Sequence, residues 1–454
     1  MPLPDAKQHA AEIVRTLREH GHQAYFAGGC VRDLLLSREP ADYDVATDAT
    51  PQQVIEIFPQ TFAVGEQFGV VLIPDADGAT GVPARPSEHG KATVEVATFR
   101  SDVGYSDGRH PDEVRFTKDP REDVQRRDFT INGMMLDPAT NEILDFVGGR
   151  EDLKAGIVRA IGDPNRRFAE DKLRMLRAVR FAARFDYQID PATMAAIQKL
   201  APQIRQVSCE RVREELTKML TEGHASRAFE LLDTSDLLRE VLPEIAAMKG
   251  VEQSPEYHPE GDVFVHTLLL LEKLPPNCSK TLAWGALLHD VGKPPTFRLA
   301  PDRIRFDGHV EVGVKMAAEI CRRLRFSNYE TDQILALVAN HMRFADVHRM
   351  KQSTLKRFLR LPAFDEHLEL QRLDCLSSHG NLDAYDFSRE QLRAMPPEAI
   401  RPTPLISGHD LIEAGYQPGP RFKEVLTAVE DAQLEGRLGS REAAMEYVQR
   451  EFPL

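Results

Sequence analysis

The periodicity of the apolar residues changes near residue 150, and this change limits the folds open to the chain. Before it, helical spacing at residues 10 to 20 alternates with strand-like stretches such as "QAYFAGG", "VVLIPD" and "ATVEVATF". After it, the spacing is almost entirely helical to about residue 390, as in "FAEDKLRMLRAVRFAARF" and "VGVKMAAEICRRLRF". The pattern predicts an α+β chain in which a mixed head precedes all-α domains.

The length of 454 residues is too great for one hydrophobic core and predicts about three domains of roughly 150 residues each. Shifts in pattern divide the chain into a head, a helical part, a second helical part and a short tail, which we place at 1–150, 151–250, 251–390 and 391–454. Within the head, "ADGATGVPARPSEHGK" predicts an exposed loop insertion between two strands. The glycines of "GHDLIEAGYQPGP" in the tail suit either an RNA contact or helix capping.

Charge and hydropathy exclude several classes of protein. No apolar run reaches the roughly 18 residues of a membrane span, and the N-terminus lacks the apolar centre of a signal peptide, so we expect a cytoplasmic protein without membrane contact. The net charge of −14 argues against indiscriminate coating of nucleic acid. Residues 150 to 184 nevertheless carry ten basic and five acidic side chains, a net of +5 that indicates one anionic ligand held in one place.

The stretch "ADYDVATD" contains a candidate metal site. Along a strand, Asp42 and Asp44 share one face, about 7 Å apart, while Tyr43 and Val45 share the other. Two such carboxylates can converge on hard cations that also hold phosphates. By itself, an Asp-x-Asp pair more often belongs to the solvent-exposed edge of a sheet. Glu95, in "TVEVATF", is either a third carboxylate of the same site or an exposed sheet acid.

The residues upstream strengthen the metal interpretation. "FAGGCVRDLLL" places Gly28 and Gly29 at the end of a strand, directly before a helix whose first turn carries Arg32. Glycines permit close approach of a ligand to the backbone, and free amides at a helix start attract phosphate. The alternative is a tight turn without a ligand. Together with the acidic pair, the turn predicts a site for a nucleotide and a metal.

The order of motifs resembles the class II template-independent nucleotidyltransferases. Gly-Gly-x-Val-Arg-Asp is followed by Asp-x-Asp, "RRDFTING", "EDKLRMLRAVRF" and "ERVREEL". That family includes the tRNA enzymes that build the 3′-terminal CCA, their CC-adding and A-adding relatives, and bacterial poly(A) polymerases. The resemblance covers roughly residues 20 to 220. It implies a small nucleotidyltransferase head with a mixed sheet, followed by an all-α neck and body.

The resemblance also implies a chemistry. Asp42 and Asp44 would bind two Mg²⁺ ions, one activating the RNA 3′-hydroxyl and the other stabilising pyrophosphate as it leaves. Nucleotide binding would fall to five residues. Gly29 and Arg32, next to Gly28, would bind the phosphates of the incoming nucleotide, and Arg127 and Asp128 would position its triphosphate and sugar. The alternative for "RRDFT" is a solvated helix start in which the aspartate pairs with an arginine.

"EDKLRMLR" is the most distinctive motif. If it forms one helix, Asp171, Arg174 and Arg177 lie on one face, where a plain ion pair is the simplest reading. A carboxylate can, however, accept from the exocyclic amine of cytosine or adenine, while a guanidinium donates to the adjacent ring nitrogen; uracil and guanine present the reversed pattern. The resemblance gives this selection to Asp171 and Arg174. It places Arg177 and Arg180 near the nucleotide, although Arg180 could be purely structural.

Two stretches bear on which family member this is. "FAVGEQFGVVLI" lacks the Arg-rich stretch that poly(A) polymerases tend to carry. "SDVGYSDGRHPDEVRF" resembles the flexible loop, with Asp107 and Arg109, that CCA-adding and A-adding enzymes keep. We therefore expect addition of CCA to the tRNA 3′ end from CTP and ATP, with A addition alone second and poly(A) synthesis third. The oligomeric state does not follow from the sequence.

A second constellation lies in residues 255 to 385, which resemble the HD phosphohydrolase domain through "LLHDVGKP". Imidazoles with a carboxylate suit a transition metal or a metal-bound water. The expected metal ligands are His266, His289, Asp290 and Asp374. His309 and His341 could join a second metal. Two alternatives stay open: a phosphohydrolase that uses Ni²⁺, Co²⁺ or Mn²⁺ on RNA ends, and a scaffold for tRNA contact.

Overall fold

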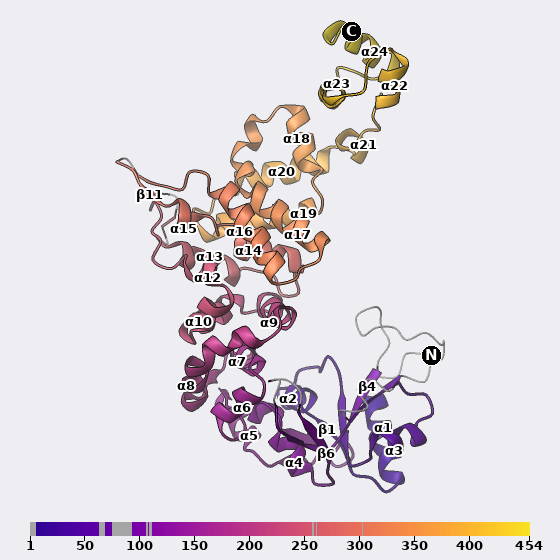
Figure 1. Ribbon diagram of the computed structural model, residues 1–454, viewed down its shortest axis with the longest axis vertical. Coiled ribbons are helices and arrows are strands. Elements are labelled where there is room, and N and C mark those ends of the chain that lie inside the picture. Colours follow the sequence, from indigo (N-terminus) through magenta and orange to yellow (C-terminus); the bar gives the residue numbers. More distant parts are fainter. Residues whose placement is uncertain are drawn as a thin grey trace. The chain divides into compact units, whose positions relative to one another are not determined.

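The computed structural model describes residues 6–62, 69–74, 93–105, 108, 111–256, 258–259, 261–301 and 303–454. They belong to two compact units (Figure 1). The first unit consists of Met1–Met219 and Arg227–Pro243, and the second of Leu220–Ser226 and Glu244–Leu454. None of the helices in the described part is both long enough and apolar enough to cross a membrane.

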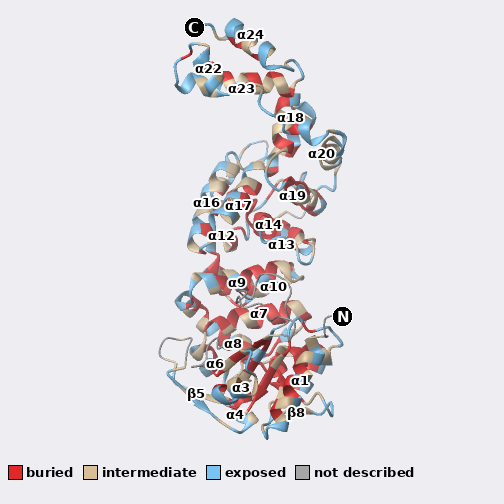
Figure 2. Cartoon of the chain, turned by 90° about the vertical axis from the view of Figure 1, so that its right-hand side faces the viewer, coloured by how far each residue is buried: buried red, intermediate tan, exposed pale blue. Residues whose placement is uncertain are grey.

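A six-stranded sheet forms the centre of the first unit. Its order is β3-β4-β2-β1-β7-β8, and because β2 and β4 pair in parallel while the other pairs are antiparallel, the sheet is mixed, as predicted. The strands are β1 (Ala24–Ala27), β2 (Asp44–Thr47), β3 (Val70–Pro74), β4 (Thr93–Thr98), β7 (Met134–Leu136) and β8 (Ile143–Asp145). The red residues along these strands and along α1 (Ala6–Glu19) in Figure 2 form the core of the head.

The stretch predicted as a flexible loop is in part a hairpin. Strands β5 (Arg100–Val103) and β6 (Glu113–Phe116) pair in antiparallel fashion. The sequence missed this hairpin because each strand is only four residues long and strongly polar. Asp107 and Arg109 lie outside the described residues, as does the loop insertion predicted between β3 and β4.

Helices complete the first unit. Helix α3 begins after Thr50, whose side chain caps it by accepting from the Gln53 amide. The helices are α2 (Gly29–Leu35), α3 (Pro51–Ile57), α4 (Pro120–Gln125), η3 (Thr130–Asn132), α5 (Gly149–Ala155), α6 (Pro164–Glu170), α7 (Leu173–Phe185), α8 (Pro191–Leu200), η4 (Ala201–Gln206), α9 (Cys209–Thr221), α10 (Ala225–Thr234) and α11 (Leu237–Val241). Two short strands, β9 (Ile157–Val158) and β10 (Gln188–Ile189), pair in parallel.

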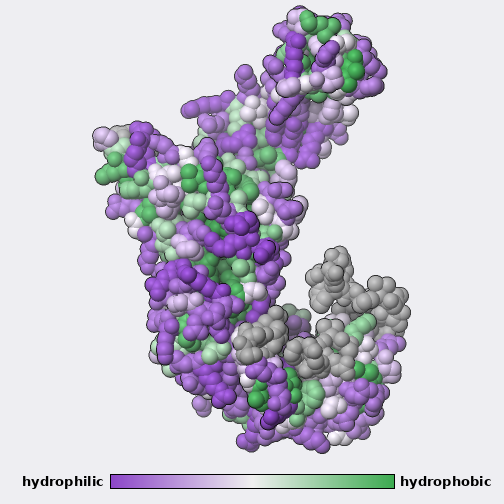
Figure 3. Space-filling view, viewed as in Figure 1, coloured by the Kyte–Doolittle hydropathy of each residue, from purple (hydrophilic) through white to green (hydrophobic). Residues whose placement is uncertain are grey.

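The second unit is mainly helical in its described residues, which also form a short hairpin of β11 (Arg298–Leu299) and β12 (Ile304–Arg305) and a single bridge between Glu252 and Asp262. In Figure 3 hydrophobic atoms are visible over the tip that carries β11, where Leu299 is exposed. The helices are α12 (Pro243–Ala246), α13 (Val263–Glu272), α14 (Lys280–Leu288), α15 (Lys293–Thr296), α16 (His309–Arg323), α17 (Asn328–Asn340), η5 (His341–Arg349), α18 (Gln352–Leu359), α19 (Phe364–Ser377), α20 (Asp383–Ala394), α21 (Pro397–Ile400), α22 (Gly408–Glu413), α23 (Pro420–Leu434) and α24 (Arg441–Glu451). The last three pack around a small core of their own.

Candidate functional site

Three carboxylates gather at one end of β2. Asp44 is the first residue of β2 and lies opposite Glu95 in the parallel register with β4, while Asp42 precedes the strand. Tyr43 and Val45, on the other face, are buried. Asp44 is half-buried, and Asp42 and Glu95 are exposed. The alternation expected from the sequence is therefore present, and it brings Glu95 to the acidic pair.

A bound cation would relieve the electrostatics of this acidic group. Desolvation and the negative charges of Glu95 and Asp42 raise the pKa of Asp44 to about 7, although Arg127 opposes them. Desolvation and the charge of Asp42 also raise the pKa of Glu95. Mutual repulsion of carboxylates costs free energy unless a cation or a proton relieves it. Carboxylate oxygens at the edge of a sheet are the ligands that a hard divalent cation prefers.

The glycine turn lies against an arginine of the "RRDFTING" motif. Gly28 has a φ of 78°, which favours glycine, and a Cβ on it would lie 2.9 Å from an Nη of Arg127. Gly29 starts α2. Both Nε and Nη2 of Arg127 donate to Asp123, at 3.2 and 3.0 Å, so its guanidinium has a fixed direction. Because Gly28 has no side chain, the guanidinium of Arg127 can lie directly against the strand-to-helix turn.

A chain of hydrogen bonds joins the other predicted nucleotide-binding residues. Arg32 donates to the Asn132 side-chain oxygen at 2.7 Å, and the Asn132 amide donates to Asp128 at 3.1 Å. Arg177 donates to the other oxygen of Asp128 at 2.9 Å. Burial opposes ionisation of Asp128, but Arg177 and Asn132 hold its pKa at about 2. Arg32 itself is only 4% exposed, so in this conformation it positions Asn132 and has little surface for a phosphate.

The prediction of one continuous helix through "EDKLRMLR" is wrong. Helix α6 ends at Glu170 and α7 begins at Leu173, and Asp171 between them is extended, with φ −143° and ψ 108°. The Asp171 carboxylate accepts from the Leu173 amide at 3.0 Å and therefore caps α7. A short polar side chain before a helix competes for its free amides in this way. Asp171 and Arg174 consequently do not share a helix face.

Each of the two predicted base-reading residues has its own partner. Both carboxylate oxygens of Asp171 accept from Arg211 of α9, at 3.3 and 2.8 Å. Arg174 donates to Glu170 at 3.0 Å and to the Arg126 carbonyl at 3.0 Å. Both residues are half-buried, so an edge of each can meet a ligand.

Arg180 is not at the surface. It donates to Glu215 at 2.7 Å, and both side chains are buried. The purely structural alternative for Arg180 is therefore the one that its surroundings favour.

Three residues of the network were not singled out from the sequence: Arg211, Asn132 and Asp123. Arg211 belongs to "ERVREEL" and Asn132 to "RRDFTING", so the motifs contained them. No spacing rule pairs Arg211 with an aspartate 40 residues earlier. Asp123 carried no signal beyond being an acid near two arginines.

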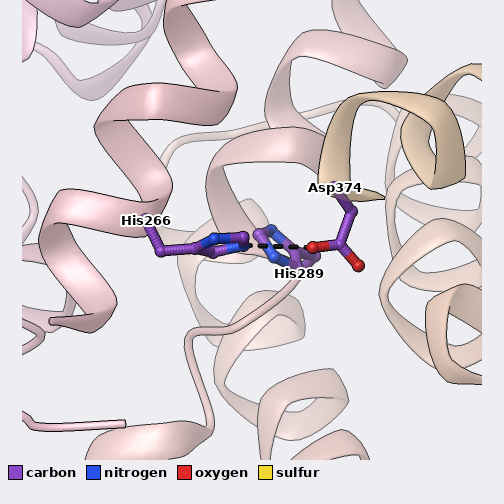
Figure 4. A group of neighbouring side chains, drawn as sticks. All are labelled: His266, His289 and Asp374. Carbon is purple, nitrogen blue, oxygen red and sulfur yellow. Dashed lines mark ion pairs between the residues drawn. The ribbon is translucent and has the colours of Figure 1, made fainter. Parts of the chain in front are cut away.

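The second unit contains a group of imidazoles and carboxylates. Ligand atoms of His266, His289 and Asp374 lie within 4.8 Å of one another, and the side chains point toward a common centre (Figure 4). His266 comes from α13, His289 follows α14, and Asp374 comes from α19. Nε2 of His266 lies 3.1 Å from Asp374. The helices thus bring together residues that are more than 100 positions apart in the sequence.

A second triad adjoins the first. Ligand atoms of Asp290, His309 and His341 also lie within 4.8 Å of one another. Asp290 connects the triads, since one of its oxygens lies 3.2 Å from Nε2 of His289 and the other 3.8 Å from Nε2 of His341. Burial and the nearby His289 lower the pKa of His341 to about 4, so its imidazole is neutral at pH 7, as a metal ligand must be. The residues that were expected to join a second metal are therefore adjacent to the first group.

Both places have the donor atoms of a divalent-metal site, but of different kinds. Imidazole nitrogens with carboxylates suit a transition metal, whereas the head offers carboxylates alone. Among the described residues, the groups of three ligand atoms within 4.8 Å are the two in the second unit. The three carboxylates of the head do not all lie within that limit of one another.

The sequence matches three family models. Residues 24–159 match the poly A polymerase head domain, residues 186–249 the probable RNA and SrmB-binding site of polymerase A, and residues 262–373 the HD domain. The models follow the order in which the acidic group, the helical part and the imidazole group occur.

Individual named proteins are also similar to this chain. The chain is 30% identical over 432 residues to a CCA-adding enzyme of Geobacillus sp. (strain WCH70), covering 95% of this chain and 93% of that protein. It is 38% identical over 278 residues to a CCA-adding enzyme of Lactobacillus helveticus (strain DPC 4571), covering 60% of this chain and 65% of that protein, which is less than two thirds of that relative. The crystal structure of the Bacillus stearothermophilus CCA-adding enzyme in complex with CTP matches with a TM-score of 0.72 and 27% identity over 98% of both chains. The Thermotoga maritima CCA-adding enzyme complexed with tRNA shares the fold, with a TM-score of 0.59 at 19% identity.

Proposed function

Because the chain belongs to the family of CCA-adding enzymes, we propose that it adds C and A to the 3′ end of tRNA from CTP and ATP without a nucleic-acid template. The observation that carries this proposal is the acidic group in the head. Asp44, Glu95 and Asp42 lie together beside the glycine turn and Arg127, and desolvation together with the charges of Glu95 and Asp42 raises the pKa of Asp44 to about 7. Nucleotidyl transfer needs such a cation site next to a phosphate site.

Asp42 and Asp44 would bind the metal, with Glu95 as a third ligand, and we propose Mg²⁺ because all the donors are carboxylate oxygens. When bound, the metal activates the RNA hydroxyl and stabilises the pyrophosphate that leaves. The protein then has to position the nucleotide. Arg127, fixed by Asp123, lies where it can hold the triphosphate against the turn at Gly28.

The sugar of the nucleotide would lie at Asp128. Its carboxylate stays ionised, with a pKa of about 2, and Asn132 and Arg177 fix its direction. Arg32 acts through Asn132 in this network, as a positioning residue. We therefore revise its expected role from phosphate binding to support of Asp128.

Selection of C and A would rest on Asp171 and Arg174. The Asp171 carboxylate accepts from an exocyclic amine, and Arg174 donates to the neighbouring ring nitrogen. Arg211 holds Asp171 in place through two hydrogen bonds. Arg174 is held by the hydrogen bond that it donates to Glu170. Both groups are therefore oriented before a nucleotide arrives.

The test uses three tRNA transcripts that lack CCA, lack only the final A, or are complete, each with labelled CTP or ATP. Addition of C, C and A to the first transcript is expected, and Asp44→Ala should stop it. Glu39→Gln, an exposed carboxylate of the same unit, is the matched control. Incorporation of A alone, and only on the second transcript, would make this an A-adding enzyme. Long A tails on unrelated RNA would make it a poly(A) polymerase.

Two further expectations accompany this function. A reaction that uses CTP, ATP and tRNA is expected in the cytoplasm. The division at 1–150, 151–250, 251–390 and 391–454 would separate catalysis, base selection and RNA binding, the imidazole group, and the tail.

A second function is favoured by the imidazole group itself. The two triads adjoin each other at Asp290 and can hold two transition-metal ions, such as Mn²⁺, Ni²⁺ or Co²⁺. Such a centre suits hydrolysis of a phosphate ester at an RNA end. Hydrolysis of 2′,3′-cyclic nucleotides, seen as ring opening or as release of phosphate, should require added metal. It should disappear in His289→Ala. If His289→Ala hydrolyses them as well as the unmodified protein does, the centre is only a scaffold.

A further inference from the structure

A pocket of about 340 Å³ opens beside the imidazole group in the second unit. Asp374, of the first triad, and His341, of the second, belong to its wall. The remaining wall comes from η5, α19, the turn after α19 and the start of α20. The pocket and the two triads therefore share a boundary at Asp374 and His341.

The size of the pocket limits its occupant. Ligand pockets commonly range from about 300 to 1,000 Å³, so this one is small. A volume of 340 Å³ accommodates one nucleoside but no duplex end.

The charge of the pocket determines which part of a nucleotide enters it. No Lys or Arg is among the described residues that line it, whereas Asp374 and Asp383 are. A phosphate is repelled by such walls and belongs at the metal ligands instead. The neutral, polar nucleoside portion is what the pocket can accept.

His379 supplies a directed hydrogen-bond donor. Its Nδ1 accepts from the Asn381 amide at 3.0 Å, so in the neutral ring the proton is on Nε2. The Asn381 side chain in turn accepts from the Asp383 amide at 2.8 Å, which fixes the turn before α20. An imidazole held in this way offers Nε2–H without having to find its orientation on binding.

His348 supplies a flat surface on η5. Its ring lies 4.4 Å from that of Phe387 in α20, centre to centre, with an angle of 43° between the planes. A ring that is supported from behind loses little freedom when a base stacks on it. The pocket therefore combines a stacking surface, a donor and an adjoining metal group.

We propose that this pocket binds the nucleoside of a single terminal nucleotide, with His379 and His348 as binding residues, while its phosphate reaches the two triads. The proposal rests on the hydrolytic function proposed above. It requires no covalent step by either histidine. Two sources share this chemistry: a free 2′,3′-cyclic nucleotide and the last residue of an RNA that ends in a 2′,3′-cyclic phosphate.

The first experiment measures hydrolysis in Mn²⁺ with the full chain. Substrates are 2′,3′-cyclic AMP, a short RNA with a 2′,3′-cyclic end, and bis(p-nitrophenyl) phosphate, a diester without a nucleoside. His379→Ala should raise KM for both nucleotide substrates about threefold to tenfold, as the loss of one hydrogen bond does, with little change in kcat. KM for bis(p-nitrophenyl) phosphate should not change. His379→Gln, which can place a donor near the Nε2 position, should restore part of the affinity.

The second experiment needs no metal and separates the two proposals. Titration of adenosine into the metal-free protein, followed by NMR or calorimetry, should show binding that weakens in His379→Ala and in His348→Ala. His409→Ala is the matched control, because this histidine is exposed on α22.

The outcomes are distinguishable. Adenosine binding without hydrolysis in any metal would refute the hydrolytic function and leave the pocket supported. Hydrolysis that His379→Ala and His348→Ala leave unchanged for every substrate would overturn the pocket and leave hydrolysis intact. A KM that rises for the RNA but not for 2′,3′-cyclic AMP would place the contact on an upstream nucleotide and also overturn it. Equal rises for both sources support a pocket for one nucleoside.

Discussion

The raised pKa of Asp44 predicts that the acidic group destabilises the metal-free head at neutral pH. Asp44 has a pKa of about 7 in the folded protein, against an ordinary value of 3.8, because of desolvation and the charges of Glu95 and Asp42. The folded state therefore holds this proton more tightly than the unfolded state does. Stability from this group is complete below pH 3.8, declines between 3.8 and 7, and is lost above 7.

The size of the effect follows from the same two values. At 1.36 kcal/mol per pH unit, the interval between 3.8 and about 7 corresponds to at most about 4 kcal/mol. Asp44 is only half-buried, and water weakens repulsion at such a site, so we expect about 2 kcal/mol. Asp44→Asn cannot ionise, and its stability relative to the unmodified protein should therefore rise by about this amount between pH 4 and pH 8.

Urea unfolding in EDTA at several pH values measures this difference, with hydrogen exchange in β2 and β4 reporting on the head. Glu39→Gln, at an exposed position of the same unit, should show no such trend. Added Mg²⁺ should stabilise the unmodified protein and not Asp44→Asn, because a ligand of the folded state shifts unfolding. A stability difference that is independent of pH, or that falls as pH rises, would refute the reasoning.

Three more predictions concern the pairs around the two sites. Arg211→Ala removes both hydrogen bonds to Asp171, so it should increase UTP incorporation into tRNA in a competition assay, and equal fidelity would contradict the supporting role. Glu215→Ala removes the buried carboxylate that accepts from Arg180 at 2.7 Å and should lower the free energy of unfolding in urea by about 3 kcal/mol, whereas a loss below 1 kcal/mol would mean that water replaces the contact. His289→Ala should reduce the Mn²⁺ bound after dialysis, measured by elemental analysis, while CCA addition continues at its normal rate; a loss of CCA addition would show that the two sites are not independent.

The sheet could be predicted because its signal is local. Alternation of polar and apolar residues in "ADYDVATD" and "TVEVATF" is a property of each strand alone, and burial of Tyr43 and Val45 follows from it. The parallel pairing that sets Asp44 opposite Glu95 joins strands about 50 residues apart and has no local signature. The third carboxylate was therefore a candidate from the sequence and became a neighbour only in the folded head.

The helix break at Asp171 could not be predicted, because the apolar pattern runs through it. Phe168 and Leu173 are both buried, as in a continuous helix. What ends α6 is a tertiary interaction, since the Asp171 carboxylate accepts from Arg211 of α9 and also accepts from the Leu173 amide at the start of α7. The histidines of the second unit are a similar case. "LLHDVGKP" identified one turn, but the packing of α13, α16, α17 and α19 determines which other residues meet it.

The break between α6 and α7 also bears on how two side chains could distinguish four bases. Asp171 and Arg174 are held by different partners, Arg211 for one and Glu170 for the other, so neither relies on the other for its direction. Uracil would set a carbonyl oxygen against the carboxylate and an N–H against the guanidinium. Each mismatch leaves a polar group without its partner, at a cost of about 1–3 kcal/mol. Two separately held groups cannot both relax toward the wrong base, so the two costs add. An ion pair between Asp171 and Arg174 would instead have let each satisfy the other and removed much of the penalty.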